Sequence, residues 1–428
     1  MPEPTMPPPI NQKKRLGFFE IIGPGILIAA TGVGAGDLAT ATFSGSKLGT
    51  AVLWAVLVGG VLKFVLTEGL TRWQLATGKT LLEGAAERLS PIVGWLFLPY
   101  LLVWSFFVGA ALMSANGVAI HAMVPVFSDP ADAKIVFGVA ASLIGLGLVL
   151  GGGFPLFEKI MGACIALMFT SVVTTAILLW PGTESVVSGL FIPSIPDADG
   201  EGLTWTVALM GGIGGTLTIL CYGYWIREKN RFGIDQMTVC RIDLGVGYLV
   251  TIVFGLAMVI VGTSVQIEGS GADLLVVLSD QLQSTIGSVG KWIFLIGAFG
   301  AVFSSLLGVW QAVPYLFADF WRLFIVRKSE ASHTGDSIST LQNKPYRAYL
   351  FGIATLPVLG LFMSFKEIQK LYTITGAAFL PLLALGLLIL NGRKQWVGGS
   401  VNRPVTVSVL LATLVFFGWL AWRGWLGA

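Results

Sequence analysis

The sequence predicts an all-α integral membrane protein, with about eleven transmembrane helices arranged as two five-helix repeats. Three observations lead to this fold class. Of the 428 residues, 55% are hydrophobic and 11% are charged, whereas soluble domains carry about 25% charged residues. The apolar runs are close to the roughly 20 residues that a spanning helix needs. Glycine interrupts two of these runs in the same way, half a chain apart.

The apolar runs define the predicted domain organisation. Residues 1–16 read as a disordered cytoplasmic tail, and residues 17–395 as the core, with repeats at about 17–180 and 203–391. An additional helix lies within residues 396–428. The predicted spans are 18–48 (broken), 51–73, 93–122, 134–152, 157–180, 203–226 (broken), 242–265, 290–318, 346–364, 368–391 and 404–422.

The loop charges predict the orientation in a plasma (inner) membrane. Lysine and arginine gather in alternate loops, and the intervening loops are acidic or nearly uncharged. Because cytoplasmic loops carry the excess of basic residues, we expect a cytoplasmic N-terminus and an external C-terminus. The basic residues on the predicted inner side are Lys13, Lys14, Arg15, Lys79, Arg88, Arg227, Lys229, Arg231, Arg322, Arg327, Lys328, Lys344, Arg347, Arg393, Lys394 and Arg403.

The two glycine interruptions are the most specific feature of the chain. The first runs from Thr31 to Asp37 and the second from Gly211 to Thr216. Glycine weakens a helix, and an unwound segment at membrane depth is tolerated only where protein or a cavity covers it. A matched pair of broken helices in two halves of a membrane protein points to a binding site near the midplane.

Asp37 directly follows the first interruption. A carboxylate at this depth is costly and is a functional candidate by default. Asp37 could equally cap the second half of the broken helix, since Asp is a good N-cap and suits the positive helix end. The two interpretations are compatible, and both remain open from the sequence.

Lys63 lies near the middle of the second predicted span, too far from either end to reach water. Its expected partner is a buried carboxylate, with Asp37 and Glu68 as the candidates. Glu68 and Arg72 are four residues apart and can pair on one helical face. We interpret that pair as structural, while Lys63 and its partner are candidates for an ion pair or for coupling.

Oxygen donors and flexible backbone surround the two interruptions. Hard oxygen ligands suit Mg²⁺, Ca²⁺ or Na⁺ rather than Cu⁺ or Zn²⁺, and Asp37 and Thr218 are the candidate metal ligands. Cys164, Cys221 and Cys240 are widely spaced and read as packing residues. The candidate substrate-binding residues are Gly34, Gly36, Asp37, Gly215, Thr218 and Thr373.

Several short motifs resemble, in order and spacing, the Nramp family of metal transporters. The resemblance covers about residues 20–395. It implies a leucine-transporter-like fold of two inverted five-helix repeats, a central site at helices one and six, and alternating access. The motifs are Gly23-Pro24-Gly25, Ala39-Thr40, Gly45-Ser46-Lys47-Leu48-Gly49, Arg72, Ala76-Thr77-Gly78-Lys79, Pro155-Leu156-Phe157-Glu158-Lys159, Phe303-Ser304-Ser305 and Leu380-Pro381.

The functional motifs of that family are altered in this chain. Where helix one of the family has Asp-Pro-Gly-Asn, this chain has Gly34-Ala35-Gly36-Asp37, so the metal-ligand Asp falls on Gly34. Where helix six has Met-Pro-His, this chain has Thr218-Ile219-Leu220, and the soft methionine ligand is lost. The family's acidic proton-path positions in helix three and a helix-six histidine fall on Ala111, Ser114 and Trp225.

These observations favour a secondary transporter for a hard divalent cation such as Mg²⁺, working without the usual proton relay. The alternative is a carrier of a small organic solute such as an amino acid, in the same fold. A channel or a non-transporting sensor fits less well, and no nucleophile–base pairing or phosphate-binding loop indicates an enzyme. We expect the partners to be the lipid bilayer and a small ion or solute, with no cofactor and no nucleic acid; a monomer is compatible with the sequence.

Overall fold

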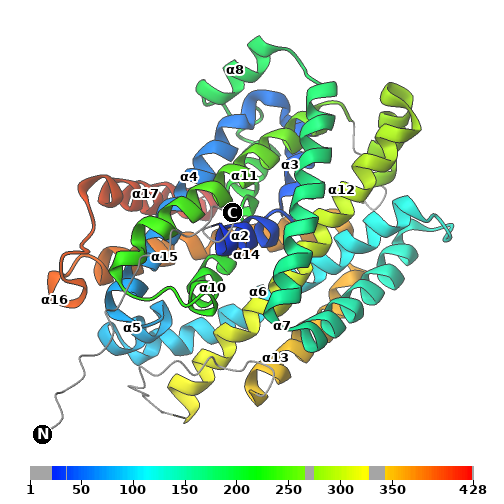
Figure 1. The fold of residues 1–428 in the computed structure, drawn as a ribbon. Helices are drawn as coiled ribbons and strands as arrows, with labels where there is room; N and C mark the ends of the chain where they lie inside the picture. The colour runs from blue at the N-terminus through cyan, green and yellow to red at the C-terminus, as the bar shows by residue number, and fades with distance from the viewer. Residues whose placement is uncertain (1–21, 35, 266–273, 327–342, 427–428) are drawn as a thin grey trace, which may run out of the picture.

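The computed structural model describes residues 22–34, 36–265, 274–326 and 343–426, and these residues form helices joined by short turns without any strand (Figure 1). The predicted tail at residues 1–16 lies outside this part of the chain. Seven helical stretches are long and apolar enough to cross a membrane within the described residues. The all-α prediction is therefore confirmed.

The first predicted span is broken, as expected. Helix α2 (Gly23–Gly32) begins with Pro24 in its first turn, where a missing amide hydrogen costs nothing. A π-helical turn, η1 (Gly36–Thr40), and helix α3 (Ala41–Leu48) follow the interruption. The chain then turns at Gly49 and enters the long helix α4 (Leu53–Thr77) through η2 (Gly49–Val52).

The sixth predicted span is broken too. Helix α9 (Glu201–Gly212) ends at the glycine cluster, and the chain continues through the 3₁₀ turn η3 (Leu217–Cys221) into α10 (Tyr222–Glu228). Gly214 and Gly215 have φ values of 71° and 75°. A side chain would strain the backbone in this left-handed region, so glycine at these two positions permits the break.

Two very long helices each bend at a glycine. Helix α7 (Pro130–Leu178) has 49 residues, so a straight α7 would be about 74 Å long, more than twice the thickness of a hydrocarbon core. It bends at Gly153, where φ is 60° and ψ is 178°, between the predicted spans 134–152 and 157–180. Helix α12 (Leu274–Phe320) bends at Gly287 in the same way.

The remaining spans follow the predicted order. The seven long stretches become eleven spans, as predicted, when α7 is counted as two, α3 is separated from α4, and the shorter helices Lys344–Thr355 and Pro404–Leu426 are added. The other helices are α5 (Leu81–Arg88), α6 (Pro91–Met123), α8 (Thr183–Phe191), α11 (Met237–Thr263), α13 (Lys344–Thr355), α14 (Phe365–Ala377), α15 (Phe379–Leu390), α16 (Lys394–Val397) and α17 (Pro404–Leu426), and the short turns are η4 (Ile234–Gln236), η5 (Trp321–Val326) and η7 (Leu356–Phe362).

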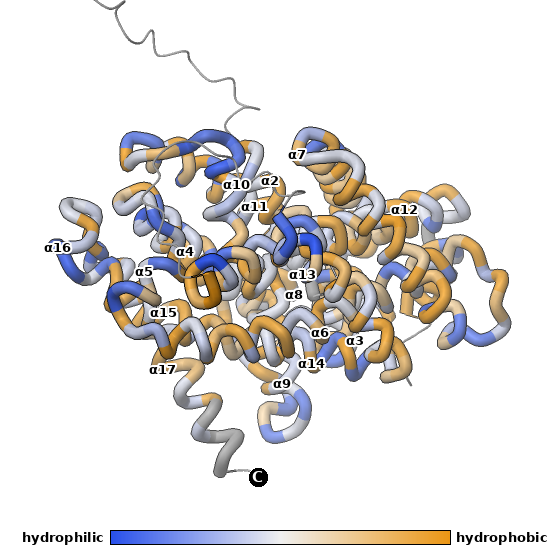
Figure 2. The backbone as a smooth tube through the Cα atoms, turned by 90° about the horizontal axis from the view of Figure 1, so that it is seen from below, coloured by the Kyte–Doolittle hydropathy of each residue, from blue (hydrophilic) through white to orange (hydrophobic). Residues whose placement is uncertain are grey.

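The broken helices lie inside the bundle. Helix α2 contacts α11, α12 and α7 (Figure 1). Helix α9 contacts α4 and α14. Among the helices around them, α7 and α12 are mostly hydrophobic along their lengths, and much of the hydrophilic chain lies in turns and end segments such as α16 (Figure 2). Exposed apolar side chains such as Leu143, Ile177 and Leu249 suit contact with lipid. This arrangement surrounds both breaks with protein, as unwound backbone in a membrane requires.

Candidate substrate site at the two helix breaks

The two breaks touch each other through backbone. A methyl group built on Gly32, at the end of α2, would lie 2.6 Å from the carbonyl carbon of Gly214 and 2.9 Å from the amide nitrogen of Gly215. Contacts this short leave no room for a side chain. The sequence placed these segments half a chain apart, and the fold brings them into direct contact.

Asp37 links the first break to the second. Its carboxylate Oδ2 accepts a hydrogen bond from the amide of Gly214 at 3.2 Å. The side chain is 0% exposed, and Oδ1 has no hydrogen-bond partner within the described part of the chain. A buried carboxylate oxygen without a partner is costly, so this atom is the clearest mark of a place where a ligand would bind.

The unpartnered oxygen faces helix α11. A methyl group built on Gly255 of α11 would lie 3.5 Å from Asp37 Oδ1. Ile213 and Val56 pack even closer to this glycine, at 2.5 and 3.0 Å from the same methyl position, so the carboxylate is enclosed on that side. The hydroxyl of Thr40, one turn after Asp37, is buried and also lacks a hydrogen-bond partner in the described structure.

Lys63 of α4 contacts the second break and is 0% exposed. Its ammonium donates hydrogen bonds to the backbone carbonyls of Gly211, at 2.8 Å, and Ile213. The expected ion pair with Asp37 or Glu68 is absent among the described residues: Asp37 is bonded to the Gly214 amide, and Glu68 pairs with Arg72 and Arg241. The physical reason is that the end of α9 leaves carbonyls without helical partners, and the lysine side chain reaches these first.

The carbonyls at the end of α2 are also satisfied by side chains. Ser304 and Ser305 of α12 donate to the carbonyls of Ala30 and Thr31, at 3.0 and 2.5 Å. A methyl group on Gly34 would collide with Ser305, so Gly34 packs against α12. The Thr31 hydroxyl lies over Gly308 of the same helix. The freed oxygens of the first break are thus largely committed to α12.

The other predicted site residues are close to the second break. A methyl group on Gly215 would collide with the Thr218 hydroxyl, which places these two residues together. Thr373 of α14 packs its backbone carbonyl beside Gly211, but its hydroxyl donates to the Gln369 carbonyl of its own helix at 3.0 Å. Gly36 is the first residue of η1. The structure therefore gathers Asp37, Gly215 and Thr218 near the breaks, while the hydroxyl of Thr373 is turned into its own helix.

Glu68 and Arg72 lie away from this centre. They pair at 3.4 Å, and Glu68 also pairs with Arg241 of α11 at 2.7 Å. Arg72 donates to the Val401 carbonyl and to the side chain of Asn402. Both residues therefore join α4 to neighbouring segments near its C-terminal half and do not reach the breaks.

A cluster of side chains that could hold a metal ion is missing from the part of the chain that the structure describes. It contains no group of three or more His, Cys, Asp or Glu side chains that could hold a metal ion. Cys221, one turn after Thr218, is buried and free. A metal held at the breaks would therefore have Asp37 as its single carboxylate and would take its other ligands from backbone, hydroxyls or water.

Two carboxylates that the sequence analysis did not single out as site residues tie the broken helices down at one end of the bundle. Asp243 of α11 accepts from the amide of Gly25 at 2.8 Å, from the Tyr222 hydroxyl at 2.8 Å and from Arg231 at 2.9 Å. It therefore holds α2 and α10 together. Its position inside a predicted span was the signal that could have revealed it.

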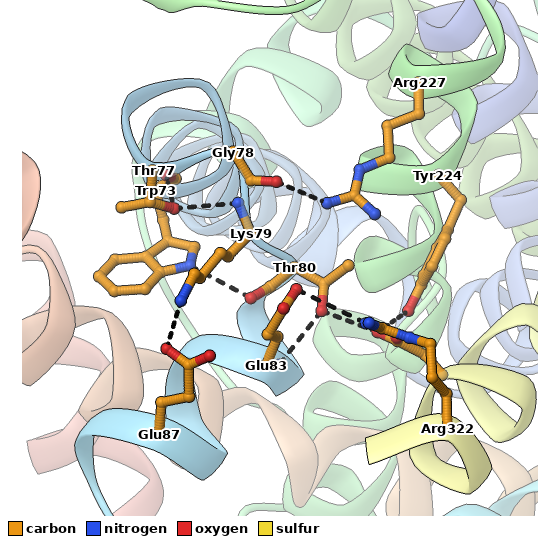
Figure 3. Close-up of polar contacts among 11 residues, drawn as sticks. Trp73, Thr77, Gly78, Lys79, Thr80, Glu83, Glu87, Tyr224, Arg227 and Arg322 are labelled. Atoms are coloured by element: carbon orange, nitrogen blue, oxygen red, sulfur yellow. Dashed lines mark hydrogen bonds and ion pairs between the residues drawn. The ribbon is translucent and has the colours of Figure 1, made fainter. Parts of the chain in front are cut away.

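Asp319 of α12 makes a second cluster at the same end. Its carboxylate accepts from Thr80 at 2.7 Å and from the Tyr224 hydroxyl at 2.9 Å, and it pairs with Arg322 at 2.7 Å. Figure 3 shows Thr80, Tyr224 and Arg322 converging there, with Arg227 reaching the carbonyl of Gly78. A small cavity lies beside this cluster, lined by Leu70, Gln74, Thr80, Leu81, Leu82, Leu220, Tyr224 and Leu316.

Two interrupted helices meet inside a bundle of spanning helices, beside a buried carboxylate and a buried ammonium. This arrangement is that of an inverted-repeat membrane transporter. The model of the Natural resistance-associated macrophage protein-like family, Nramp, matches residues 25–425. The chain belongs to this family, whose members are secondary metal transporters rather than enzymes.

Relatives in sequence extend over most of the chain. An uncharacterized protein of Pasteurella multocida, PM0681, is 26% identical over 421 residues, which cover 94% of this chain and 94% of that protein. The divalent metal cation transporter MntH of Chromohalobacter salexigens is 24% identical, over 70% of this chain and 71% of that protein.

Solved structures share the fold. The manganese transporter of Eremococcus coleocola, in complex with an aromatic bis-isothiourea substituted compound, has a TM-score of 0.71 at 15% identity, covering 92% of this chain and 84% of that chain. MhsT in complex with L-phenylalanine has a TM-score of 0.63 at 14% identity, covering 95% and 97%. At these identities the likeness concerns the fold alone, and it confirms the predicted inverted-repeat class.

Proposed function

We propose that this protein is an alternating-access carrier of a hard divalent cation, with Mg²⁺ as the preferred substrate. The observation that carries the proposal is Asp37 Oδ1, a buried carboxylate oxygen with no hydrogen-bond partner among the described residues, at the contact between the two helix breaks. A cation would satisfy this oxygen and offset the cost of burying the charge.

The donor set favours a hydrated cation over a transition metal. Mg²⁺ loses water reluctantly and is commonly held by one or two carboxylates while it keeps several waters. Asp37 would bind the ion or its water, with Thr218 and the backbone at Gly34, Gly36 and Gly215 around it. Among the described residues, no group of three or more His, Cys, Asp or Glu side chains could hold a transition metal at the breaks.

Transport without the family's usual proton relay is part of the proposal. Where the resemblance places acidic groups in helix three, this chain has Ala111 and Ser114, and the Ser114 hydroxyl donates to the Ala111 carbonyl. Trp225 stands where the resemblance implies a histidine, and its indole donates to Gln311. None of the three side chains exchanges protons near neutral pH, so the cation gradient itself would drive uptake.

The orientation and domain limits belong to the same proposal. We place the end of the bundle with Lys79, Arg227 and Arg322 in the cytoplasm, together with the N-terminus, and the C-terminus outside. The two repeats would span about residues 17–180 and 203–391, with residues 396–428 as an added helix.

Uptake into proteoliposomes tests the proposal. Purified protein should move Mg²⁺, and Mn²⁺ more weakly, down a concentration gradient. The isosteric Asp37→Asn variant should lose at least tenfold in rate, since it removes the charge and keeps the shape. Asp132→Asn, a change at an exposed position in the first turn of α7, is the matched control and should transport normally. Wild-type uptake no faster than leakage into empty vesicles would refute the proposal.

A small organic solute is the second candidate, and one observation favours it. Lys63 brings a positive charge to the second break, which Asp37 also contacts, and this charge disfavours a bare cation and suits a solute that carries a carboxylate. Thermal unfolding separates the two candidates: stabilisation by amino acids or small carboxylates, with none from Mg²⁺ or Mn²⁺, would favour the organic solute.

A further inference from the structure

The ammonium of Lys63 is placed where a dissolved cation would be expected to bind. Helix α9 ends at Gly212, and the last carbonyls of a helix lack intrahelical partners and form the negative end of its dipole. The Gly211 carbonyl of this last turn and the carbonyl of Ile213, the residue just after the helix, accept hydrogen bonds from Lys63. Carbonyls at the ends of broken half-helices are ligands for coupling cations in membrane carriers.

Lys63 has no route to water. It lies within α4, which runs from Leu53 to Thr77, and its side chain is 0% exposed. A buried ammonium is expensive unless it is compensated. The compensation here consists of the two carbonyls, the end of the α9 dipole, and the more distant charge of Asp37. This is the set of groups that a monovalent cation, freed of its water, would need.

The backbone around the ammonium is held in place independently. The Thr67 hydroxyl donates to the carbonyl of Lys63 at 2.7 Å and is itself hydrogen-bonded to the Tyr248 hydroxyl at 2.7 Å. Gly59, one turn earlier on α4, packs close to the backbone of Met210. Helix α4 is therefore fixed against α9 and α11 on both sides of Lys63, so removing the side chain would leave the two carbonyls unpaired rather than let the helices close.

We propose that the ammonium of Lys63 occupies a monovalent-cation site at the end of α9. This carrier therefore needs no Na⁺, and shortening Lys63 opens the site to Na⁺. The proposal goes beyond the transported substrate and stands whether that substrate is a divalent cation or an organic solute. It assigns Lys63 a positioning role: the lysine holds the second break in the shape that the substrate meets.

The test is thermal unfolding of the full-length protein in detergent, in NaCl against choline chloride of equal concentration, without divalent cations. The wild type should melt at the same temperature in both salts. Lys63→Ala should melt lower in choline, and NaCl should raise its midpoint by about 2 °C or more, as specific binding to the folded state requires. Lys344→Ala, a change at an exposed lysine on α13, is the matched control and should show no sodium effect.

Two further variants sharpen the result. Lys63→Gln keeps a donor for the carbonyls without the charge and should respond to Na⁺ less than Lys63→Ala. Asp37→Asn combined with Lys63→Ala should lose most of the sodium effect, because the countercharge is gone.

A higher melting temperature of the wild type in NaCl than in choline chloride would overturn the proposal. This comparison needs no variant, so it tests the proposal even if Lys63→Ala fails to fold. Folded Lys63→Ala and Lys63→Gln without any sodium response would overturn it as well. Failure of Mg²⁺ uptake would refute the proposed substrate and leave these melting results unchanged.

Discussion

Asp37 and Gly214 are joined across the two helix breaks, with the carboxylate of the first break accepting the backbone amide of the second at 3.2 Å. This hydrogen bond joins the first unwound segment directly to the second. It uses one carboxylate oxygen and leaves the other without a partner in the described structure. The residue that connects the two breaks is thus also the one best placed to sense a ligand.

The backbone contact beside this bond should tolerate no side chain. Gly32→Ala would place a methyl group 2.6 Å from the carbonyl carbon of Gly214, and we expect it to lower the free energy of unfolding by about 1–3 kcal/mol. Gly147→Ala on α7 is the control, because a methyl group there meets no atom within 4 Å. Thermal melting in detergent compares the two; equal midpoints would show that the breaks are not in contact.

Removing the charge of Lys63 should separate the two substrate classes. Lys63→Met takes away a positive charge that acts on Asp37, so a divalent cation should bind more tightly, with an apparent KM for Mg²⁺ lower by about three- to tenfold. An organic substrate held through its carboxylate would instead bind more weakly. Initial rates of uptake over a range of Mg²⁺ concentrations give the answer, and an unchanged KM would show that Lys63 and the cation do not interact.

Asp243 should matter for stability more than any other carboxylate at its end of the bundle. Asp243→Asn breaks a buried pair with Arg231 and weakens the bonds to Gly25 and Tyr222. Breaking this buried pair should lower the free energy of unfolding by about 3–5 kcal/mol. Asp235→Asn, at an exposed position in η4, is the matched control. If Asp243→Asn and Asp235→Asn melt at the same temperature, the Asp243 cluster contributes no net stability.

The Asp319 cluster should control access to the small cavity beside it. Asp319→Ala removes the acceptor shared by Thr80 and Tyr224, which should free α10 from α12. A cysteine introduced at Leu220, in a background without Cys164, Cys221 and Cys240, should then react several-fold faster with a water-soluble maleimide. Thr183→Cys, exposed at the start of α8, should react at an unchanged rate. Unaltered labelling of Leu220→Cys would mean that the cluster does not close this path.

Much of the fold follows from local features of the sequence. Side chains that face lipid must be apolar, and backbone groups in lipid must be paired within a helix. The apolar runs alone therefore predicted the spanning helices. The glycine clusters at Gly34 and Gly214 predicted where two of them break, because glycine weakens a helix, and at Gly214 it also permits the left-handed backbone.

The partners of the buried charges could not be predicted in this way. The sequence suggested a carboxylate for Lys63, since opposite charges attract in a low dielectric. The fold instead brings α4 against the end of α9, where unpaired carbonyls at Gly211 and Ile213 are nearer to the ammonium than any carboxylate. Asp243 and Asp319 were missed for the same reason: their importance depends on Gly25, Tyr222, Thr80 and Tyr224, which come from distant parts of the chain.

The sequence by itself determined which segments span the membrane, where two of them unwind, and that Asp37 and Lys63 lie at membrane depth. Only the tertiary structure decided that the two breaks touch, that Asp37 bonds to Gly214, and that Lys63 pairs with carbonyls. The division has a physical cause: hydrophobicity and glycine conformation act within a few residues of the chain, whereas hydrogen bonds between residues 148 to 177 positions apart exist only once the helices have packed.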